Sequence, residues 1–116
     1  MIIVEHKELL ITVDDYLNNL KEGIINISDL IQEGKEYQGI NIIPQVAEGL
    51  QWVDEALNAT NNYHEGELSL ENMNNFIEEI SEALENEDYI LIGDLFNYEI
   101  IPILEELQSS IKEYIK

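Results

Sequence analysis

Residues 82–107, EALENEDYILIGDLFNYEIIPILEEL, decide the fold, because almost every side chain from Tyr89 to Leu104 is apolar. At helical spacing this segment carries apolar residues on two sides instead of one. A helix that is apolar nearly all round lies at the centre of a bundle or has a partner on its second side. Asp88 is placed to cap its start, and Pro102 predicts a kink. The first side holds Ile92, Phe96, Ile103 and Leu107, and the second holds Ile90, Leu91, Tyr98 and Ile101.

Two carboxylates interrupt this apolar run. Asp94 falls on the second side and Glu99 falls within the first. A buried carboxylate is costly unless it is hydrogen-bonded, paired with a cation or protonated. Three interpretations of Glu99 are therefore open. It accepts a hydrogen bond inside the protein, from a tyrosine, Trp52 or a helix N-terminus; it binds a metal or a peptide; or a twist at Pro102 exposes it.

Apolar residues also recur at helical spacing outside this segment. The clearest stripe starts at Val13 and runs to Ile31, and Gly34 is placed to end that helix. A second segment changes its apolar face at Pro44, and Ser69 is a candidate N-cap for a third. Short connections favour antiparallel neighbours. The predicted helices span 14–32, 36–59 with a break or kink at Pro44, 69–86, and 88–115 with a kink at Pro102.

The first thirteen residues predict a different structure. Ile2–Val4 and Leu9–Val13 are rich in β-branched residues and flank a polar turn at His6 and Lys7, which is typical of a hairpin. A two-stranded hairpin must pack on the helices or pair with another chain, because it is not stable alone. The sequence therefore predicts one mainly α domain over 1–116, an antiparallel four-helix bundle with a short N-terminal β-hairpin at 1–13.

The chain is strongly acidic, with 25 Asp and Glu residues, five lysines, no arginine and a net charge of −20. Such a surface repels a phosphate backbone or an anionic membrane, since binding to either depends on Lys and Arg. We therefore expect neither nucleic acid nor membrane as a partner. A basic protein or a divalent cation would be attracted, although the charge also serves simply to keep a cytosolic protein soluble.

The chain has no cysteine, which excludes disulfides, thiolate metal sites and cysteine nucleophiles. The apolar run at its start is too short and too charged for a signal peptide. The run Tyr89–Leu104 is shorter than a bilayer span and contains two carboxylates. We expect a cytoplasmic protein.

Glu78, Glu79 and Glu82 form EExxE, which matches the first half of the metal-binding pattern of all-α nucleotide pyrophosphohydrolases. The second half, an ExxD on the next helix, has no match. A divalent-metal enzyme would use these three carboxylates with Asp94 or Glu99. The chain also lacks Glu-x-x-His pairs, the residue pattern of a serine hydrolase and a glycine-rich phosphate loop. We therefore predict no catalytic residue and no cofactor.

Trp52 lies at the edge of the apolar face of its helix. That position most often marks the margin of a core, but Trp and Tyr are also enriched at the energetic centres of interfaces. Tyr98 and Ile101 lie on the second apolar side of the helix at 88–115. We predict Trp52, Tyr98 and Ile101 as interaction residues.

Two stretches, AEGLQWVDEAL at 47–57 and ALENEDYILIGDLFNYEIIPILEEL at 83–107, resemble a family of small, uncharacterised helical proteins from low-GC Gram-positive bacteria. The family pattern places Glu-Gly-Leu-x-Trp on one helix and Asp-Tyr…Asp-x-x-x-Tyr-Glu-x-x-Pro on a later one. The resemblance implies a helical bundle and no particular activity. The matching residues are Glu48, Gly49, Leu50, Trp52, Asp88, Tyr89, Asp94, Tyr98, Glu99 and Pro102.

Three hypotheses about function follow. The leading one is a non-catalytic cytosolic helical protein that acts in protein–protein interaction or self-association, with a partner protein or a homo-oligomer; it predicts an exposed apolar patch around Tyr98 and Ile101. The alternative is the divalent-metal enzyme, which requires at least three of its carboxylates to converge on one ion. The second alternative is an acidic DNA mimic, which requires carboxylates in a phosphate-like double row.

Overall fold

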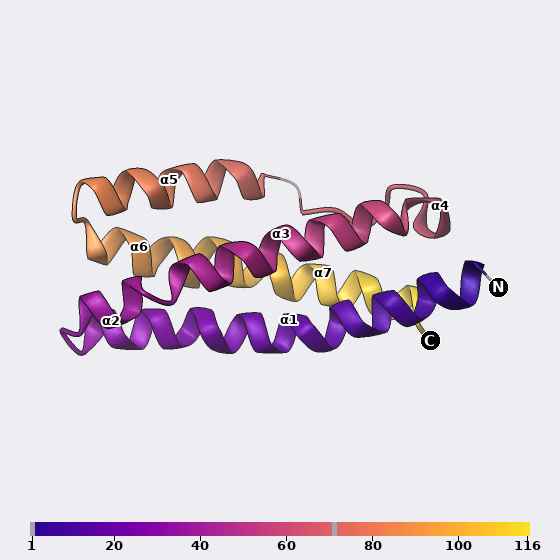
Figure 1. Cartoon of the computed structure of the whole chain (residues 1–116), viewed down its shortest axis with the longest axis horizontal. Helices are drawn as coiled ribbons and strands as arrows, with labels where there is room; N and C mark the ends of the chain where they lie inside the picture. Colours follow the sequence, from indigo (N-terminus) through magenta and orange to yellow (C-terminus); the bar gives the residue numbers. More distant parts are fainter. Residues whose placement is uncertain (1, 71) are drawn as a thin grey trace.

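The computed structural model describes residues 2–70 and 72–116, and within these two ranges it contains helices and no strand. Figure 1 shows α1, α3, α5 and the α6–η1–α7 segment lying along one long axis with alternating direction. The molecule measures 49 × 22 × 19 Å along its principal axes. The elements are α1 (Ile2–Gln32), α2 (Glu36–Ile40), α3 (Ile43–Ala59), α4 (Asn61–His64), α5 (Met73–Glu85), α6 (Tyr89–Leu95), the π-helical turn η1 (Phe96–Ile100) and α7 (Ile101–Tyr114).

The predicted N-terminal β-hairpin is wrong, because α1 already begins at Ile2; Met1 lies outside the described residues. Leu10 is fully buried and lies three residues before Val13, at the head of the buried stripe that continues through Leu17 and Leu20. Burial along this helical period outweighs the local β propensity of the branched residues. One helix of 31 residues therefore replaces a hairpin and a shorter helix.

Gly34 ends α1 with a left-handed backbone, φ +82°. The amide of Gly34 donates to the Ile31 carbonyl and the amide of Lys35 donates to the Leu30 carbonyl, the pair of bonds that closes a Schellman motif. The short α2 follows, and Pro44 lies in the first turn of α3. A proline is tolerated there because its missing N–H would have no partner inside the helix.

The third predicted helix starts later than expected. Ser69 does not cap it; α5 begins at Met73, after Asn72 in a left-handed conformation with φ +64°. Residues 65–70 form a non-helical connection from α4, which begins with a turn at Glu65 and Gly66. Asp88 caps the next helix as predicted, because its side chain accepts a hydrogen bond from the amide of Leu91 at 3.2 Å.

Helix α6 continues into α7 through the π-helical turn η1. The Ile101 amide donates to the Phe96 carbonyl five residues earlier, and Pro102 follows directly, without an N–H of its own. The wider turn changes the register of burial: Ile92, Phe96, Ile100 and Leu104 are buried at four-residue intervals. Glu99 therefore leaves the apolar stripe and is exposed. The structure therefore agrees with the third interpretation of Glu99, in which a change of helical twist near Pro102 exposes its side chain.

Helix α1 is the central helix of the bundle. It packs closely against α2, α3, α6, η1 and α7, and α5 packs against α6 and η1. At the crossing of α1 with the π-helical turn, the Asn97 amide donates to the Ser28 hydroxyl across 2.6 Å. Within the described residues, α3 and α5 have no comparably close backbone contact. The bundle is thus closed between α1 and α3, between α1 and α7 and between α5 and α6, and it is open between α3 and α5.

Candidate functional site

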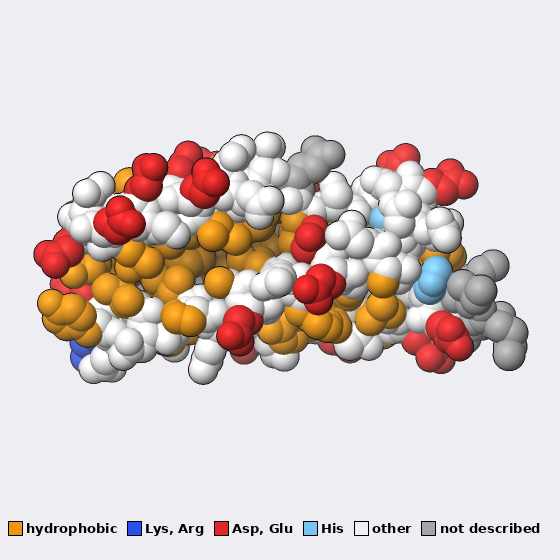
Figure 2. Space-filling view, turned by 45° about the horizontal axis from the view of Figure 1, so that its top comes forward, with side chains coloured by type: hydrophobic (Ala, Val, Ile, Leu, Met, Phe, Trp, Pro, Cys, Tyr) orange, Lys and Arg blue, Asp and Glu red, His pale blue; other side chains and the backbone are white. Residues whose placement is uncertain are grey.

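The open side of the bundle is an apolar groove between α3 and α5. It contains two adjoining hollows of about 380 and 100 Å³, which share Ala47, Leu50 and Ile77 in their linings. Figure 2 shows the hydrophobic side chains gathered in this hollow, with carboxylates on either side. We call it the α3–α5 groove. Its apolar lining comprises Ile43, Val46, Ala47 and Leu50 of α3, Leu70 of the connection before α5, Met73, Ile77, Ile80 and Leu84 of α5, and Phe96 and Ile100 of η1.

The groove is apolar because α3 and α5 each carry apolar side chains over a wider part of the helix surface than they bury. Helix α3 packs against α1, and α5 packs against α6 and η1. Val46 and Leu50 are buried between α3 and α1, yet they also line the groove. Ile77 and Leu84 are only half-buried, although they continue the apolar seam of α5. In a closed four-helix bundle such residues would meet the neighbouring helix. Here they face a hollow.

The rim of the groove is polar and negative. Asp54 of α3 lines it together with Gln51, and Asn74 and Ser81 line it from α5. The chain has no arginine, and its five lysines lie at or before Lys35 and at or after Lys112. Helices α3 and α5 and the stretch between them therefore contain no Lys or Arg, and His64 is the one histidine there. The field over the groove is therefore negative.

A second apolar surface lies on α6 and η1. Ile90 is 78% exposed and Tyr98 is 72% exposed, and Asp94 lies between them on the same helical face. Leu91 beside them is also exposed. Of the predicted interaction residues on this helix, Tyr98 is thus free at the surface, whereas Ile101 is half-buried.

Trp52, the third predicted interaction residue, lies at the surface with one side of its ring against α1. Its ring meets the ring of Tyr16 edge-on, with centroids 5.2 Å apart and planes at 80°. It is 37% exposed. This contact holds α3 to α1, next to Gly49, where no side chain separates the two helices. Gly49, Leu50 and Trp52 of the Glu-Gly-Leu-x-Trp pattern therefore contribute to packing in this fold, whereas Glu48 is exposed.

The five candidate metal ligands lie in three separate places. Glu78, Glu79 and Glu82 are exposed on α5, and Asp94 lines a different hollow, between α1 and α6. Glu99 lines a third, a groove of about 590 Å³ beside α5 and α7. Across residues 2–70 and 72–116, no three His, Asp or Glu side chains are grouped so that they could hold a metal ion.

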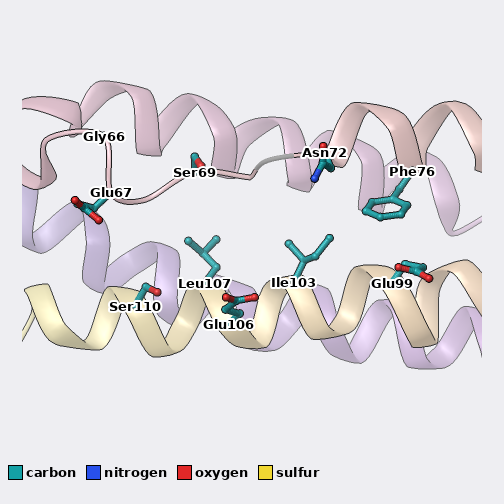
Figure 3. Close-up of a pocket in the computed structure, with 10 residues that line it drawn as sticks. All are labelled: Gly66, Glu67, Ser69, Asn72, Phe76, Glu99, Ile103, Glu106, Leu107 and Ser110. Atoms are coloured by element: carbon teal, nitrogen blue, oxygen red, sulfur yellow. The ribbon is translucent and has the colours of Figure 1, made fainter.

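The groove that contains Glu99 has a mixed lining. Figure 3 shows Glu99 and Glu106 on the η1–α7 segment and Glu67 on the connection before α5, spread along the groove, with Ile103 and Leu107 pointing into it. The carboxylates alternate with apolar side chains and do not converge on one point. This arrangement gives a negative surface and no ligand set.

His64 is a structural residue that the sequence did not identify. It is 2% exposed at the end of α4. Its Nδ1 accepts a hydrogen bond from the amide of Leu68 at 3.2 Å, so Nε2 carries the proton and donates to the Leu57 carbonyl at 2.9 Å. His64 thus fixes the connection between α4 and α5 against the end of α3. A histidine in a polar stretch gives no signal of such burial.

Two tyrosines have shifted ionisation. Burial raises the pKa of the Tyr89 phenol above its ordinary value of 10.0, and the nearby charge of Glu87 raises it further. Burial likewise raises the pKa of Tyr114, followed by the charges of Glu67 and Glu65. Both phenols favour the neutral form in the folded protein. Neither lies in the α3–α5 groove.

Comparison with known proteins identifies one family. The model of a domain of unknown function, DUF8042, matches residues 8–110. No curated protein and no solved structure matches the chain. In the part of the chain that the structure describes, no helix is long and apolar enough to cross a membrane.

Proposed function

Since the chain belongs to the DUF8042 family, whose function is unknown, we propose a function from the structure itself: a non-catalytic helical protein that acts in protein–protein interaction through the α3–α5 groove. The observation that carries this proposal is the open side of the bundle. Ile77 and Leu84 of α5 line the same hollow as Ala47 and Leu50 of α3, and within the described residues the backbones of the two helices do not approach one another closely there.

A partner that covered this side would complete the bundle. Apolar surface removed from water contributes about 25 cal/mol per Å², and a helix laid into an apolar groove is a common mode of recognition between proteins. The surface formed by Ile90, Leu91 and Tyr98 adds a second apolar area, on α6 and η1, outside the groove. Exposed apolar areas that continue over several residues often mark interaction sites.

Self-association is the weaker form of this proposal. Each copy carries a net charge of −20, so two copies repel one another at ordinary ionic strength. We therefore propose a heterologous protein partner in preference to a homo-oligomer. We propose also a cytoplasmic location and, from the family resemblance, with which the isoleucine- and asparagine-rich composition agrees, an origin in a low-GC Gram-positive bacterium.

The two alternatives have less support. The metal-enzyme hypothesis needs three converging carboxylates, and the described residues do not provide them. The DNA-mimic hypothesis stays a prediction. Neither accounts for an apolar groove between two helices.

Photocrosslinking in cells tests the proposed function. A photoreactive phenylalanine analogue replaces Ile77 in the groove, and in the control it replaces Glu82, which is exposed on α5 outside the groove. The proposal predicts a discrete crosslinked protein with the label at position 77 and not at position 82. The same products from both positions, or none from either, would contradict it.

A further inference from the structure

We infer that the α3–α5 groove binds a basic amphipathic helix of another protein. This inference rests on the proposed function and specifies the partner's chemistry. Three observations support it: the apolar lining, the length of the groove and the sign of the charge around it.

The lining selects an apolar face. The two hollows have eleven apolar lining residues. The smaller hollow is lined almost entirely by apolar side chains, among them Ile43, Val46, Ile80 and Leu84, and Ser81 is its one polar lining residue. A ligand that fills it must offer apolar side chains with few hydrogen-bonding groups, because polar atoms would lose water without gaining partners. One apolar face of a helix meets this requirement.

The length fits a short helix. The groove-lining residues extend from Ile43 to Asp54 on α3 and from Met73 to Leu84 on α5. At 1.5 Å per residue each wall is roughly 16 Å long, or about three helical turns. A partner helix of about 12 residues or more can therefore contact the groove along its whole length, with anchors at i, i+3, i+4 and i+7.

The charge selects a basic partner. On α3 and α5 the acidic residues are unopposed by any Lys or Arg, and Asp54 lines the groove itself. Lysine or arginine on the polar face of a bound helix would lie near these carboxylates, which favours association and speeds encounter. A second copy of this chain would bring further negative charge to the same rim. Asp54 is the carboxylate that lines the groove. The other acidic residues of the two helices add to the negative field without lining the groove; they are Glu48 and Glu55 of α3 and Glu78, Glu79, Glu82 and Glu85 of α5.

Three fluorescent synthetic peptides test the inference by anisotropy with the full chain. Each has about 14 residues, enough for the three turns of the groove. The first is a leucine–lysine amphipathic helix; the second has the same leucine face with glutamate in place of lysine; the third has the composition of the first with its leucines distributed around the helix. The inference predicts that the first binds at least about tenfold more tightly than either of the others, a difference of about 1.4 kcal/mol.

Matched variants locate the binding. Asp54→Lys removes a carboxylate from the groove, and Glu82→Lys makes the same charge change on the exposed surface of α5 outside it. Ala47→Gln places a larger polar side chain in the groove, and Ala59→Gln makes the same change at an exposed position at the end of α3. We expect Asp54→Lys and Ala47→Gln to weaken binding of the first peptide several-fold and the two controls to leave it near the wild-type value. Circular dichroism checks that all four variants fold.

Each other outcome overturns the inference in a distinguishable way. Equal binding of the first and third peptides, or equal losses in Asp54→Lys and Glu82→Lys, would mean attraction by total charge without a groove. Tight binding of the glutamate peptide would remove the role of charge. If no peptide binds while the label at position 77 still crosslinks a protein, the partner is of another kind and the proposed function survives. If that product is a second copy of this chain, the groove is an interface between copies.

Discussion

Gly49 of α3 lies against Leu20 of α1 so closely that a Cβ atom on Gly49 would be 2.6 Å from Leu20 Cδ2, and the Tyr16 hydroxyl would be closer still. The two helices therefore approach one another where α3 has no side chain. The Trp52 ring lies beside the same Tyr16. This close approach holds α3 to α1 and leaves the opposite side of α3 to line the groove.

Replacement of Gly49 by alanine should destabilise the fold. The added methyl group must displace both the Tyr16 hydroxyl and the end of the Leu20 side chain. Inserting atoms into a packed contact costs about 1–3 kcal/mol, which exceeds the roughly 0.5–1 kcal/mol gained when alanine replaces a glycine inside a helix. We expect a lower free energy of unfolding in urea, with a matching fall in the thermal midpoint.

Gly23 provides the matched control. It lies within α1, and a Cβ atom there would be 3.6 Å from Val46 Cγ2, an ordinary contact. Gly23→Ala should therefore stabilise the protein, by about 0.5–1 kcal/mol through helix propensity. Opposite signs for the two variants support the packing described here; equal stabilisation by both would contradict it.

His64→Leu should destabilise the protein. It leaves the buried Leu68 amide without its acceptor, whereas the Leu57 carbonyl keeps the Thr60 hydroxyl as a donor. A buried polar group left unpaired costs about 1–3 kcal/mol. His6→Leu, at a half-buried position on α1, should have a smaller effect on the urea midpoint. An equal effect would mean that the two bonds of the His64 ring contribute nothing.

The free energy of unfolding should fall in alkali, and it should fall further than it would if Tyr89 and Tyr114 had the same pKa in the folded and unfolded chain. The pKa values of Tyr89 and Tyr114 are raised in the folded state, so the unfolded chain loses these protons first. Their contribution to stability is therefore complete below pH 10 and is lost as the pH rises through the folded pKa values. Unfolding in urea between about pH 8 and 11 measures the loss, and a Tyr89→Phe, Tyr114→Phe double variant should show a shallower decline. Parallel curves would contradict the shifts.

Salt should stabilise the protein without regard to the cation. Screening relieves the repulsion of a chain with a net charge of −20, and each 1 kcal/mol gained raises the thermal midpoint by about 4 °C. Mg²⁺, Mn²⁺ and Ca²⁺ should act as NaCl does at equal ionic strength, because residues 2–70 and 72–116 contain no group of three ligands. A saturable rise with one divalent ion at micromolar concentration would indicate a specific site.

Much of the fold follows from local pattern. The stripe that continues from Val13 to Ile27 is buried along its length, and the cap at Asp88 and the stop at Gly34 are where their chemistry predicts. The hairpin prediction is wrong because the buried helical stripe extends back to Leu10, and its burial outweighs the β propensity of the branched residues near it. Local preference is weak where a long apolar face can be buried.

The site could not be predicted in the same way. The π-helical turn before Pro102 shifts the register by a fraction of a turn, and this decides that Ile100 is buried and Glu99 is exposed. The α3–α5 groove depends on which helices approach one another, and periodicity shows only that Ile77 and Leu84 are apolar. Whether a neighbour covers them is a property of the tertiary structure.

The most direct test of the account is an NMR titration of the ¹⁵N-labelled protein with the leucine–lysine amphipathic helix. Amide shift changes report which residues the peptide contacts. The account predicts the largest changes along residues 43–54 of α3 and 73–84 of α5, with small changes at Tyr98 and on the outer face of α1. Changes centred on Ile90 and Tyr98, or spread evenly over the acidic surface, would contradict the assignment of the α3–α5 groove as the binding site.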